Sequence, residues 1–280
     1  TPDVTTASTA YFRIYNEADG TLLTVSDADF LPLALLCEMS ADAPEEALKA
    51  QAIAIHTSCS RLRQQNAEAD TDFSCNTETC SVYAPAAVLA EKYGEDWEAA
   101  FARVRILCAE VTSLCLYYDG ALITAPYFAL SAGCTQPYED AFGGDALPYL
   151  QAAACPSDLL SSACRAETVI APETVRAAFP TIEFTDDPAE WFTDPQKNSA
   201  GYVKSIVFCG TPLTGTQVRT ALSLPSAAFT VTFDGTDFRF TTLGRGHGVG
   251  MSQTAAITMA ENGADYTEIL AYFYPETELR

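Results

Sequence analysis

Two residues of this chain stand out as candidates for chemistry, Glu38 and His247. Glu38 lies between Cys37 and Met39 at the end of an apolar run, where desolvation favours the protonated carboxyl that a general acid needs. His247, one of two histidines, lies in GRGHGVGMSQ (residues 244–253), whose glycines let the backbone approach a ligand closely or adopt positive φ. Both residues also fit structural roles, Glu38 as a cap or a solvent-facing carboxylate and His247 as a hydrogen-bonded side chain in a tight crossing. The residue types alone leave these alternatives open.

The ten cysteines are a second source of chemistry. The best local disulfide candidates are Cys75 with Cys80 and Cys155 with Cys164, because both pairs lie in turn-rich segments. Cys75 and Cys80 could also bind zinc, but two histidines in the chain leave few further ligands, so we expect no metal. Ser131, in LSAGC, lacks the G-x-S-x-G frame of a nucleophile elbow.

Helices that would position these residues follow from hydrophobic periodicity and turn signals. The segment 31–39 is almost entirely apolar and predicts a short helix that ends near Glu38. A break at residues 40–44 separates it from a second helix, which starts at Pro44-Glu45-Glu46 and is apolar over most of its circumference. The same signals predict further helices over 95–110, 172–179, 254–262 and, behind a cap at Asp265 and Glu268, a last helix ending at Pro275.

Strands and turns complete the expected fold. Alternating segments around Asp19-Gly20 and Asp119-Gly120 predict two hairpins, and residues 131–165, rich in Ser, Gly, Pro and Cys, predict surface loops. Three further strands are expected over 202–208, 228–233 and 238–243. Helices and antiparallel hairpins mix without a βαβ rhythm, so we expect an α+β fold around one core. We expect a single domain, residues 1–280, with a small insertion at 166–200.

Charge and hydropathy exclude two classes of function. The chain has 15 Lys and Arg against 37 Asp and Glu, a net charge of −22, which phosphate backbones and anionic lipid surfaces would repel. We therefore expect no nucleic-acid partner. No apolar run approaches the ~20 residues of a transmembrane helix, so we expect no membrane span in this chain.

Five stretches, in the same order, resemble motifs of the stage II sporulation protein D (SpoIID) family. They cover nearly the whole chain, with 166–200 supported least, and they are LPLALLCEMSADAPEEALKAQAIAIHT, CNTETCSVYA, YFALSAGCTQPYEDAFGGDALPYLQ, GTQVRTALSLPSAAFTV and GRGHGVGMSQTAAITMAENGADYTEILAYFYPETEL. The last stretch is the longest and most specific, and it makes the glycines around His247 a family signature.

The resemblance implies a bacterial lytic transglycosylase. The family's best-known members cleave peptidoglycan strands without stem peptides between N-acetylmuramic acid and N-acetylglucosamine, and leave a 1,6-anhydro end. Glu38 falls on the family's catalytic glutamate and would act as general acid and base, with no cofactor. The resemblance also implies a wall-facing or extracellular location, with room for a membrane anchor outside this sequence, and other wall-remodelling proteins as partners. The residues expected to line the groove or fix its walls are Gln51, His56, Tyr83, Ser131, His247 and Gln253.

Three departures from the family pattern keep a second interpretation open. His56 stands where the family has arginine, and Phe128 and Thr79 stand where it has histidine. Some members bind zinc near the cysteine loop, and with Thr79 we expect none here. His56 is expected to replace the arginine in part, as a shorter donor charged only below neutral pH. The alternative is a non-catalytic glycan-binding protein or an activator of a wall amidase.

Overall fold

The computed structural model describes residues 10–280. Its internal contacts divide the chain into two compact units. The first unit runs to Ala125 and includes residues 263–269 and 277–280, and the second comprises 126–262 and 270–276. The fold class is α+β, as the sequence predicted, with helices and mainly antiparallel strands in small sheets. A single domain of residues 1–280 around one core stays a prediction.

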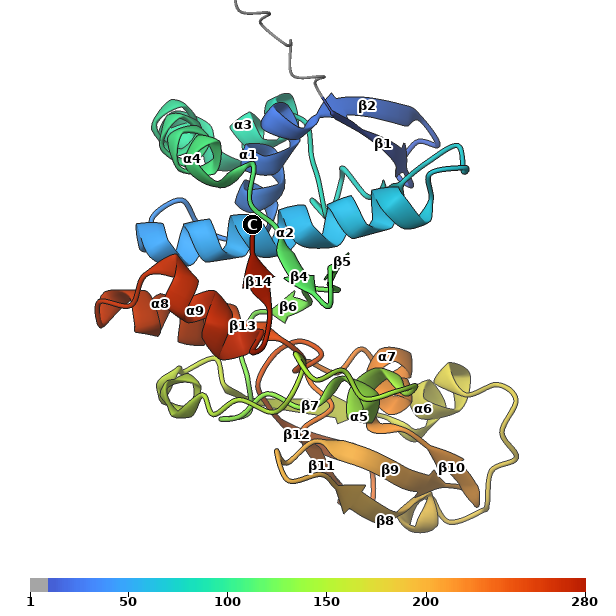
Figure 1. The fold of residues 1–280 in the computed structure, drawn as a ribbon. Coiled ribbons are helices and arrows are strands. Elements are labelled where there is room, and N and C mark those ends of the chain that lie inside the picture. The colour runs from blue at the N-terminus through green and yellow to red at the C-terminus, as the bar shows by residue number, and fades with distance from the viewer. Residues whose placement is uncertain (1–9) are drawn as a thin grey trace, which may run out of the picture. The chain divides into compact units, whose positions relative to one another are not determined.

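A buried helix, α1 (Asp27–Glu38), is central to the first unit (Figure 1). Its residues 30–36 are all buried, because α1 packs against α2 (Glu45–Gln65), α3 (Ala86–Tyr93) and α4 (Trp97–Val111). A helix enclosed by other elements needs apolar side chains on every face, which explains the uninterrupted apolar run in the sequence. Within residues 10–280, no helix is both long and apolar enough to cross a membrane.

The strands of the first unit form two small sheets. In one sheet, β1 (Tyr11–Asn16) pairs antiparallel with β2 (Leu22–Ser26), which confirms the first predicted hairpin. The same strand pairs in parallel with β3 (Phe73–Cys75), a contact that the sequence analysis did not predict. The second sheet consists of β4 (Leu116–Tyr118), β5 (Ala121–Leu122) and β14 (Glu278–Leu279).

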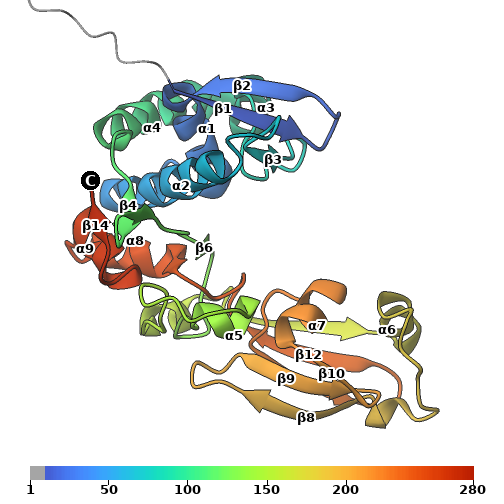
Figure 2. The same ribbon diagram turned by 45° about the vertical axis from the view of Figure 1, so that its right-hand side comes forward.

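Two antiparallel three-stranded sheets form the body of the second unit (Figure 2). One sheet has the order β11 (Phe229–Phe233), β12 (Phe238–Leu243), β7 (Arg165–Ile170), and the other β10 (Thr211–Leu213), β9 (Val203–Phe208), β8 (Phe192–Lys197). Both sheets contribute to one aromatic-rich core, together with Val175 of α6 (Pro172–Ala178) and Val218 of α7 (Gly215–Ala221). Phe208 and Phe240, one from each sheet, are fully buried in that core.

The segment 166–200 belongs to this core. It contributes β7, α6 and β8 to the unit, with a short 3-10 turn at Pro188–Glu190. Trp191 is fully buried; its indole N–H donates to the Thr185 carbonyl at 3.0 Å, and the Arg176 guanidinium lies 4.6 Å above its ring. The segment is therefore part of the packing of the second unit, and its status as an insertion in the family pattern stays a prediction.

Residues 131–165 are mostly loops and turns, as their composition predicted, and most of them are at least partly exposed. The segment also includes α5 (Tyr138–Phe142) and a 3-10 turn at Pro156–Leu160. Backbone hydrogen bonds such as Thr135 N–H to the Ala153 carbonyl (2.8 Å) satisfy polar groups where the segment is buried. Its buried polar side chains are Ser131, Thr135, Gln136 and Asp158.

The expected disulfide between Cys155 and Cys164 is absent. All ten cysteines are free thiols, and all lie in the described part of the chain. The Cys155 thiol faces the Ala153 carbonyl at 3.6 Å, and the Cys164 thiol faces the Ser131 carbonyl at 3.7 Å. The prediction is wrong because each sulfur is directed to a backbone acceptor of its own.

The last helix, α9 (Tyr266–Phe273), begins with the predicted cap. The Asp265 carboxylate accepts from the backbone N–H groups of Thr267 and Glu268, and the Glu268 carboxylate accepts from the Asp265 N–H at 3.0 Å. This reciprocal arrangement satisfies N–H groups that have no partner inside the helix.

Candidate functional site

Glu38 is the last residue of α1, and its side chain is partly exposed. The preceding turns are buried, so the helix brings a carboxyl group out of an apolar interior. Burial, then the charge of Cys80, then that of Glu38 raise the pKa of Cys37 to about 12. Glu38 thus lies at the boundary between the buried part of α1 and the segment that follows the helix.

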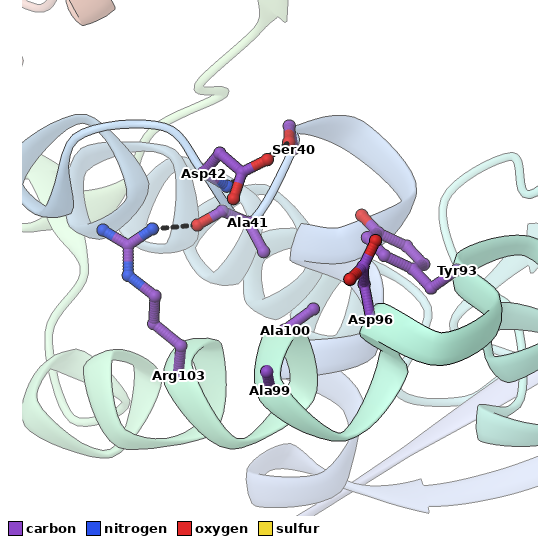
Figure 3. Close-up of a pocket in the computed structure, with 8 residues that line it drawn as sticks. All are labelled: Ser40, Ala41, Asp42, Tyr93, Asp96, Ala99, Ala100 and Arg103. Carbon is purple, nitrogen blue, oxygen red and sulfur yellow. Dashed lines mark hydrogen bonds between the residues drawn. The ribbon is translucent and has the colours of Figure 1, made fainter.

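A polar cavity of about 350 Å³ lies in the first unit. Its first lining residue, Ser40, follows Glu38 by two positions in the sequence. This volume is within the range of small-molecule sites, ~300–1,000 Å³. Figure 3 shows that the segment after α1 forms one wall, while α4 and the residues before it form the floor and the other sides. The sequence analysis did not find this cavity. Its lining residues are Ser40, Ala41, Asp42, Tyr93, Asp96, Ala99, Ala100 and Arg103.

A tight loop separates Cys75 from Cys80. Asn76 and Ser81 exchange two backbone hydrogen bonds, at 3.1 and 2.9 Å, which close the loop. The Asn76 side chain also accepts from the Thr79 N–H at 3.1 Å. Thr79, at a histidine position of the family pattern, therefore has its backbone held in a turn by Asn76.

The two thiols of this loop have different surroundings. The Cys80 thiol raises the pKa of Cys37, whereas burial and then the charges of Glu17 and Asp19 raise the pKa of Cys75. Both thiols are free, so Cys75 and Cys80 do not form the candidate disulfide. Among residues 10–280, no group of three or more His, Cys, Asp and Glu side chains is arranged to hold a metal ion.

His56 lies on α2 in an ion-pair network, and only 6% of its surface is exposed. Its Nε2 lies 3.4 Å from the Asp27 carboxylate, and its Nδ1 lies 3.3 Å from the Cys115 sulfur. Burial alone lowers the pKa of His56, but the Asp27 and Cys115 contacts outweigh it and raise the pKa to about 9. The expectation of a histidine charged only below neutral pH is therefore wrong.

The network also places His56 away from Glu38. Asp27 is the first residue of α1 and Glu38 the last, so the two are separated by ~16 Å of helix. The Arg63 guanidinium binds Asp27 as well, at 2.7 Å, so the carboxylate joins two cations at that end. In this position His56 stabilises the start of α1.

Two other predicted site residues lie in the interior of the first unit. Gln51, on α2, is fully buried. Tyr83 is 6% exposed, and its ring stacks on Phe30 with 5.6 Å between the ring centroids. Burial is the main cause that raises the pKa of Tyr83 to about 12. A groove-wall role for Gln51 and Tyr83 stays a prediction.

In the second unit, the glycines around His247 mark a tight crossing of two chain segments. There β13 (Met251–Ser252) pairs in parallel with β6 (Tyr127–Phe128). A Cβ on Gly250 would lie 2.0 Å from the Pro126 carbonyl oxygen, and one on Gly246 would lie 2.6 Å from the Phe128 Cβ. Both glycines have positive φ, 74° and 113°. The structural interpretation of the glycine run, a close crossing that holds His247, is therefore confirmed.

His247 itself is partly buried beside aromatic rings and uncharged at neutral pH. Its Nδ1 accepts from the Val249 N–H at 3.1 Å, and the rings of Phe128 and Phe142 lie 5.4 Å from its own. Burial, helped by the positive charge of Arg219, lowers the pKa of His247 to about 4. A neutral imidazole carries no extra proton to give away at pH 7, and a hydrogen bond with the Tyr127 backbone also holds this ring.

Ser131 is tied to the start of α8 (Gln253–Glu261) through a buried carboxylate that the sequence analysis missed. Asp158 accepts from the Ser131 N–H at 2.8 Å and from the Ser252 hydroxyl at 2.7 Å. Ser252 is the N-cap of α8, and Gln253 is the first residue of that helix. The Ser252 side chain accepts from the Ala255 N–H, so this residue has a helix-start role.

The two histidines are expected to titrate on opposite sides of the ordinary value of ~6.5. One imidazole resonance should titrate near pH 9 and the other near pH 4, because His56 is paired with Asp27, whereas His247 is partly desolvated and lies near the Arg219 cation. Proton NMR of the aromatic region measures both, and His56→Gln assigns the upper one. A resonance with its midpoint at pH 6–7 would contradict this arrangement.

The same shift has a thermodynamic consequence. Because the folded pKa of His56 lies above its unfolded value, the ion pair stabilises the protein fully below pH ~6.5 and less as the pH rises through 9. The loss amounts to roughly 3 kcal/mol at ~1.4 kcal/mol per pKa unit. Denaturant unfolding should show this decline in the wild type, and a smaller one in His56→Gln.

Comparisons with known proteins agree with the sequence motifs. The family model for SpoIID, described as stage II sporulation protein, matches residues 20–106, the segment that holds Glu38 and the whole cavity. Stage II sporulation protein D of Bacillus subtilis (strain 168) is 28% identical over 277 residues, covering 98% of this chain and 80% of that protein. The protein of the same name from Bacillus amyloliquefaciens is 28% identical over 270 residues, covering 95% and 77%.

A third relative comes from another bacterium. An uncharacterised protein of Brachyspira hyodysenteriae is 32% identical over 281 residues, covering 94% of this chain and 69% of that protein. These alignments and the α+β fold define the class of protein. The chain belongs to the stage II sporulation protein D family.

Proposed function

We propose that this protein is a lytic transglycosylase that cleaves peptide-free peptidoglycan strands and leaves 1,6-anhydro-muramic ends, with Glu38 as general acid and base. The observation that carries the proposal is the place of Glu38, partly exposed at the end of a buried helix and next in the chain to a polar cavity. The names of the Bacillus relatives, which refer to sporulation, support a bacterial wall-facing location.

The reaction needs one carboxyl group. The protonated Glu38 donates its proton to the glycosidic oxygen while positive charge builds on the muramic ring. The bond from C1 to that oxygen breaks, and the C6 hydroxyl of the same ring forms the new bond to C1. The carboxylate of Glu38 then accepts the C6 hydroxyl proton, so the residue returns to its starting state. Water must be kept from C1, since hydrolysis would otherwise compete.

The state of the two histidines supports Glu38 as the proton donor. His56 is occupied by Asp27 at the other end of α1, and His247 is neutral at pH 7. No proton on either imidazole is therefore needed for the reaction as written. Gln51 and Tyr83, which lie in the same unit as Glu38, are proposed to support the site through packing and hydrogen bonds.

One observation favours a second candidate, a non-catalytic glycan-binding protein or amidase activator. The family's arginine position holds His56, whose ring nitrogens face Asp27, Cys115 and the Leu114 carbonyl. Because these contacts occupy both ring nitrogens of His56, its imidazolium is not free to bind a sugar. This position therefore differs from the family pattern in its contacts as well as in its residue type.

Incubation with peptide-free glycan strands separates the two candidates. Mass spectrometry should find anhydro-muramic ends with the wild type, and Glu38→Gln should lower their rate of formation by ~10²–10⁴-fold. The matched control is Glu91→Gln, at an exposed position of α3 in the same unit, which should keep wild-type activity. If the wild type binds the strands but never cleaves them, the transglycosylase proposal is contradicted and the non-catalytic candidate is supported.

A further inference from the structure

One face of α4 forms the floor of the cavity that begins at Ser40. Asp96, Ala99, Ala100 and Arg103 have the spacing i, i+3, i+4 and i+7, which puts them on one side of α4 and its first turn. In Figure 3 the two alanines lie between Arg103 on one side and Asp96 on the other. Small side chains at the centre of this face leave the hollow, and the polar groups surround it.

Arg103 holds the opposite wall in place. Its guanidinium donates to the Ala41 carbonyl and, at 3.1 Å, to the Ala43 carbonyl. The segment after α1 is therefore fastened to α4 over the cavity. Because these two hydrogen bonds use N–H donors of the guanidinium, the main role of Arg103 is to hold the wall in place, and fewer donors are left to bind an anion.

The remaining polar groups of the cavity are mainly acceptors. Asp42 is exposed, and its carboxylate has a long contact of 3.5 Å with the Ser40 hydroxyl. Asp96 is the N-cap residue of α4, yet within the described chain its side chain makes no capping hydrogen bond. The Tyr93 hydroxyl donates to the Leu36 carbonyl at 3.3 Å, which leaves its oxygen as an acceptor. Two carboxylates against one fastened guanidinium make the cavity acidic.

We propose that this cavity is a sugar subsite that takes a neutral N-acetylglucosamine unit and rejects N-acetylmuramic acid. The assignment rests on the proposed glycan-cleaving function. Sugar hydroxyls would donate to the carboxylates of Asp42 and Asp96, and the floor of Ala99 and Ala100 would accept an apolar face or the acetyl methyl group. Ser40 is two residues after Glu38, so its Cα lies within ~7.6 Å of the Glu38 Cα. The wall of the subsite thus begins two residues after the glutamate that would transfer the proton.

Charge decides between the two sugars of the strand. Muramic acid without its peptide carries a lactyl carboxylate, whereas N-acetylglucosamine has no charge. Like charges at contact distance repel, and the interaction is stronger beside a protein surface than in bulk water. The acidic lining therefore sets the register of a strand in which the two sugars alternate.

The test uses the Glu38→Gln protein, so that binding is measured without turnover. Tri-N-acetylchitotriose, which contains only N-acetylglucosamine units, should bind ~10-fold more weakly after Asp96→Asn or Asp42→Asn, by calorimetry or NMR titration. The control is Asp70→Asn, an equal change of charge beyond the far end of α2, ~30 Å of helix away. It should leave the affinity unchanged.

A second titration tests the choice of sugar. N-acetylmuramic acid should bind at least ~10-fold more weakly than N-acetylglucosamine, and Asp96→Asn should narrow the difference. Equal binding of the two sugars, or cavity variants that bind like the control, would overturn the subsite while Glu38→Gln still tests the reaction. Stronger binding of glucosamine than of its N-acetyl form would also overturn it, in favour of a cation site. A third outcome is that the protein binds sugar in a way that depends on Asp96 but the wild type cleaves no strands. That outcome would contradict the proposed enzymatic function and support the subsite.

Discussion

Gly250→Ala is expected to destabilise the second unit by more than ~4 kcal/mol, enough to unfold a marginally stable protein. The new Cβ would lie 2.0 Å from the Pro126 carbonyl oxygen, a backbone atom that cannot move aside without breaking the β6–β13 pairing. The same oxygen accepts the Met251 N–H at 3.1 Å, so that bond is lost too. Strain at a φ of 74° adds ~1–2 kcal/mol for a residue with a side chain.

The matched control is Gly235→Ala in the turn between β11 and β12. Gly235 also has positive φ, at 98°, but a Cβ there meets nothing within 4 Å. Its cost should be the backbone strain alone, ~1–2 kcal/mol. Denaturant unfolding of both variants gives the difference, and equal effects would show that the crossing at Pro126 is looser than the structure indicates.

Several elements follow correctly from local signals. The hairpin at Asp19-Gly20, the start of α2 after Pro44, and the cap of α9 at Asp265 were all predicted and are confirmed. Each depends on residues within a few positions of one another, for which turn chemistry, helix dipoles and caps supply a physical rule.

Features set by distant residues were missed. The pairing of β3 with β1 joins segments about sixty residues apart, and the partner of Gly250 is Pro126. No local pattern identifies either contact. The glycine run indicated that something approaches the backbone closely, but the sequence did not show what.

The errors at candidate site residues have the same origin. We predicted that His56 has the ordinary pKa of a histidine and is charged only below neutral pH. Asp27, 29 positions away in the sequence, raises that pKa, so His56 is charged at neutral pH. The two disulfides were chosen by nearness in sequence, whereas the direction of each sulfur is set by the surrounding fold. The sequence shows that four residues lie on one helical face, namely Asp96, Ala99, Ala100 and Arg103. This face encloses a cavity only because residues 40–42 form a wall opposite it, and that contact is not visible in the sequence.

The buried carboxylate of Asp158 connects two segments of the second unit through hydrogen bonds. It is fully buried, and a single oxygen, Oδ2, accepts from the Ser131 N–H and the Ser252 hydroxyl. These partners join the segment after β6 to the start of α8. The other oxygen, Oδ1, has no hydrogen-bond partner among the described residues. The group is therefore costly to bury, and we expect the junction to depend on its two hydrogen bonds.

Asp158→Ala is expected to cost ~3–5 kcal/mol of unfolding free energy, because it removes two hydrogen bonds and leaves the Ser131 N–H buried without an acceptor. Asp158→Asn should cost less, since it keeps an oxygen for that N–H. Ser252→Ala removes one of the two bonds, and in the double variant with Asp158→Ala the costs should fall short of additivity by at least ~0.5 kcal/mol. Chemical denaturation measures all four proteins. A loss below ~1 kcal/mol for Asp158→Ala would mean that the Ser131 segment finds another acceptor, and that the carboxylate does not hold α8 in place.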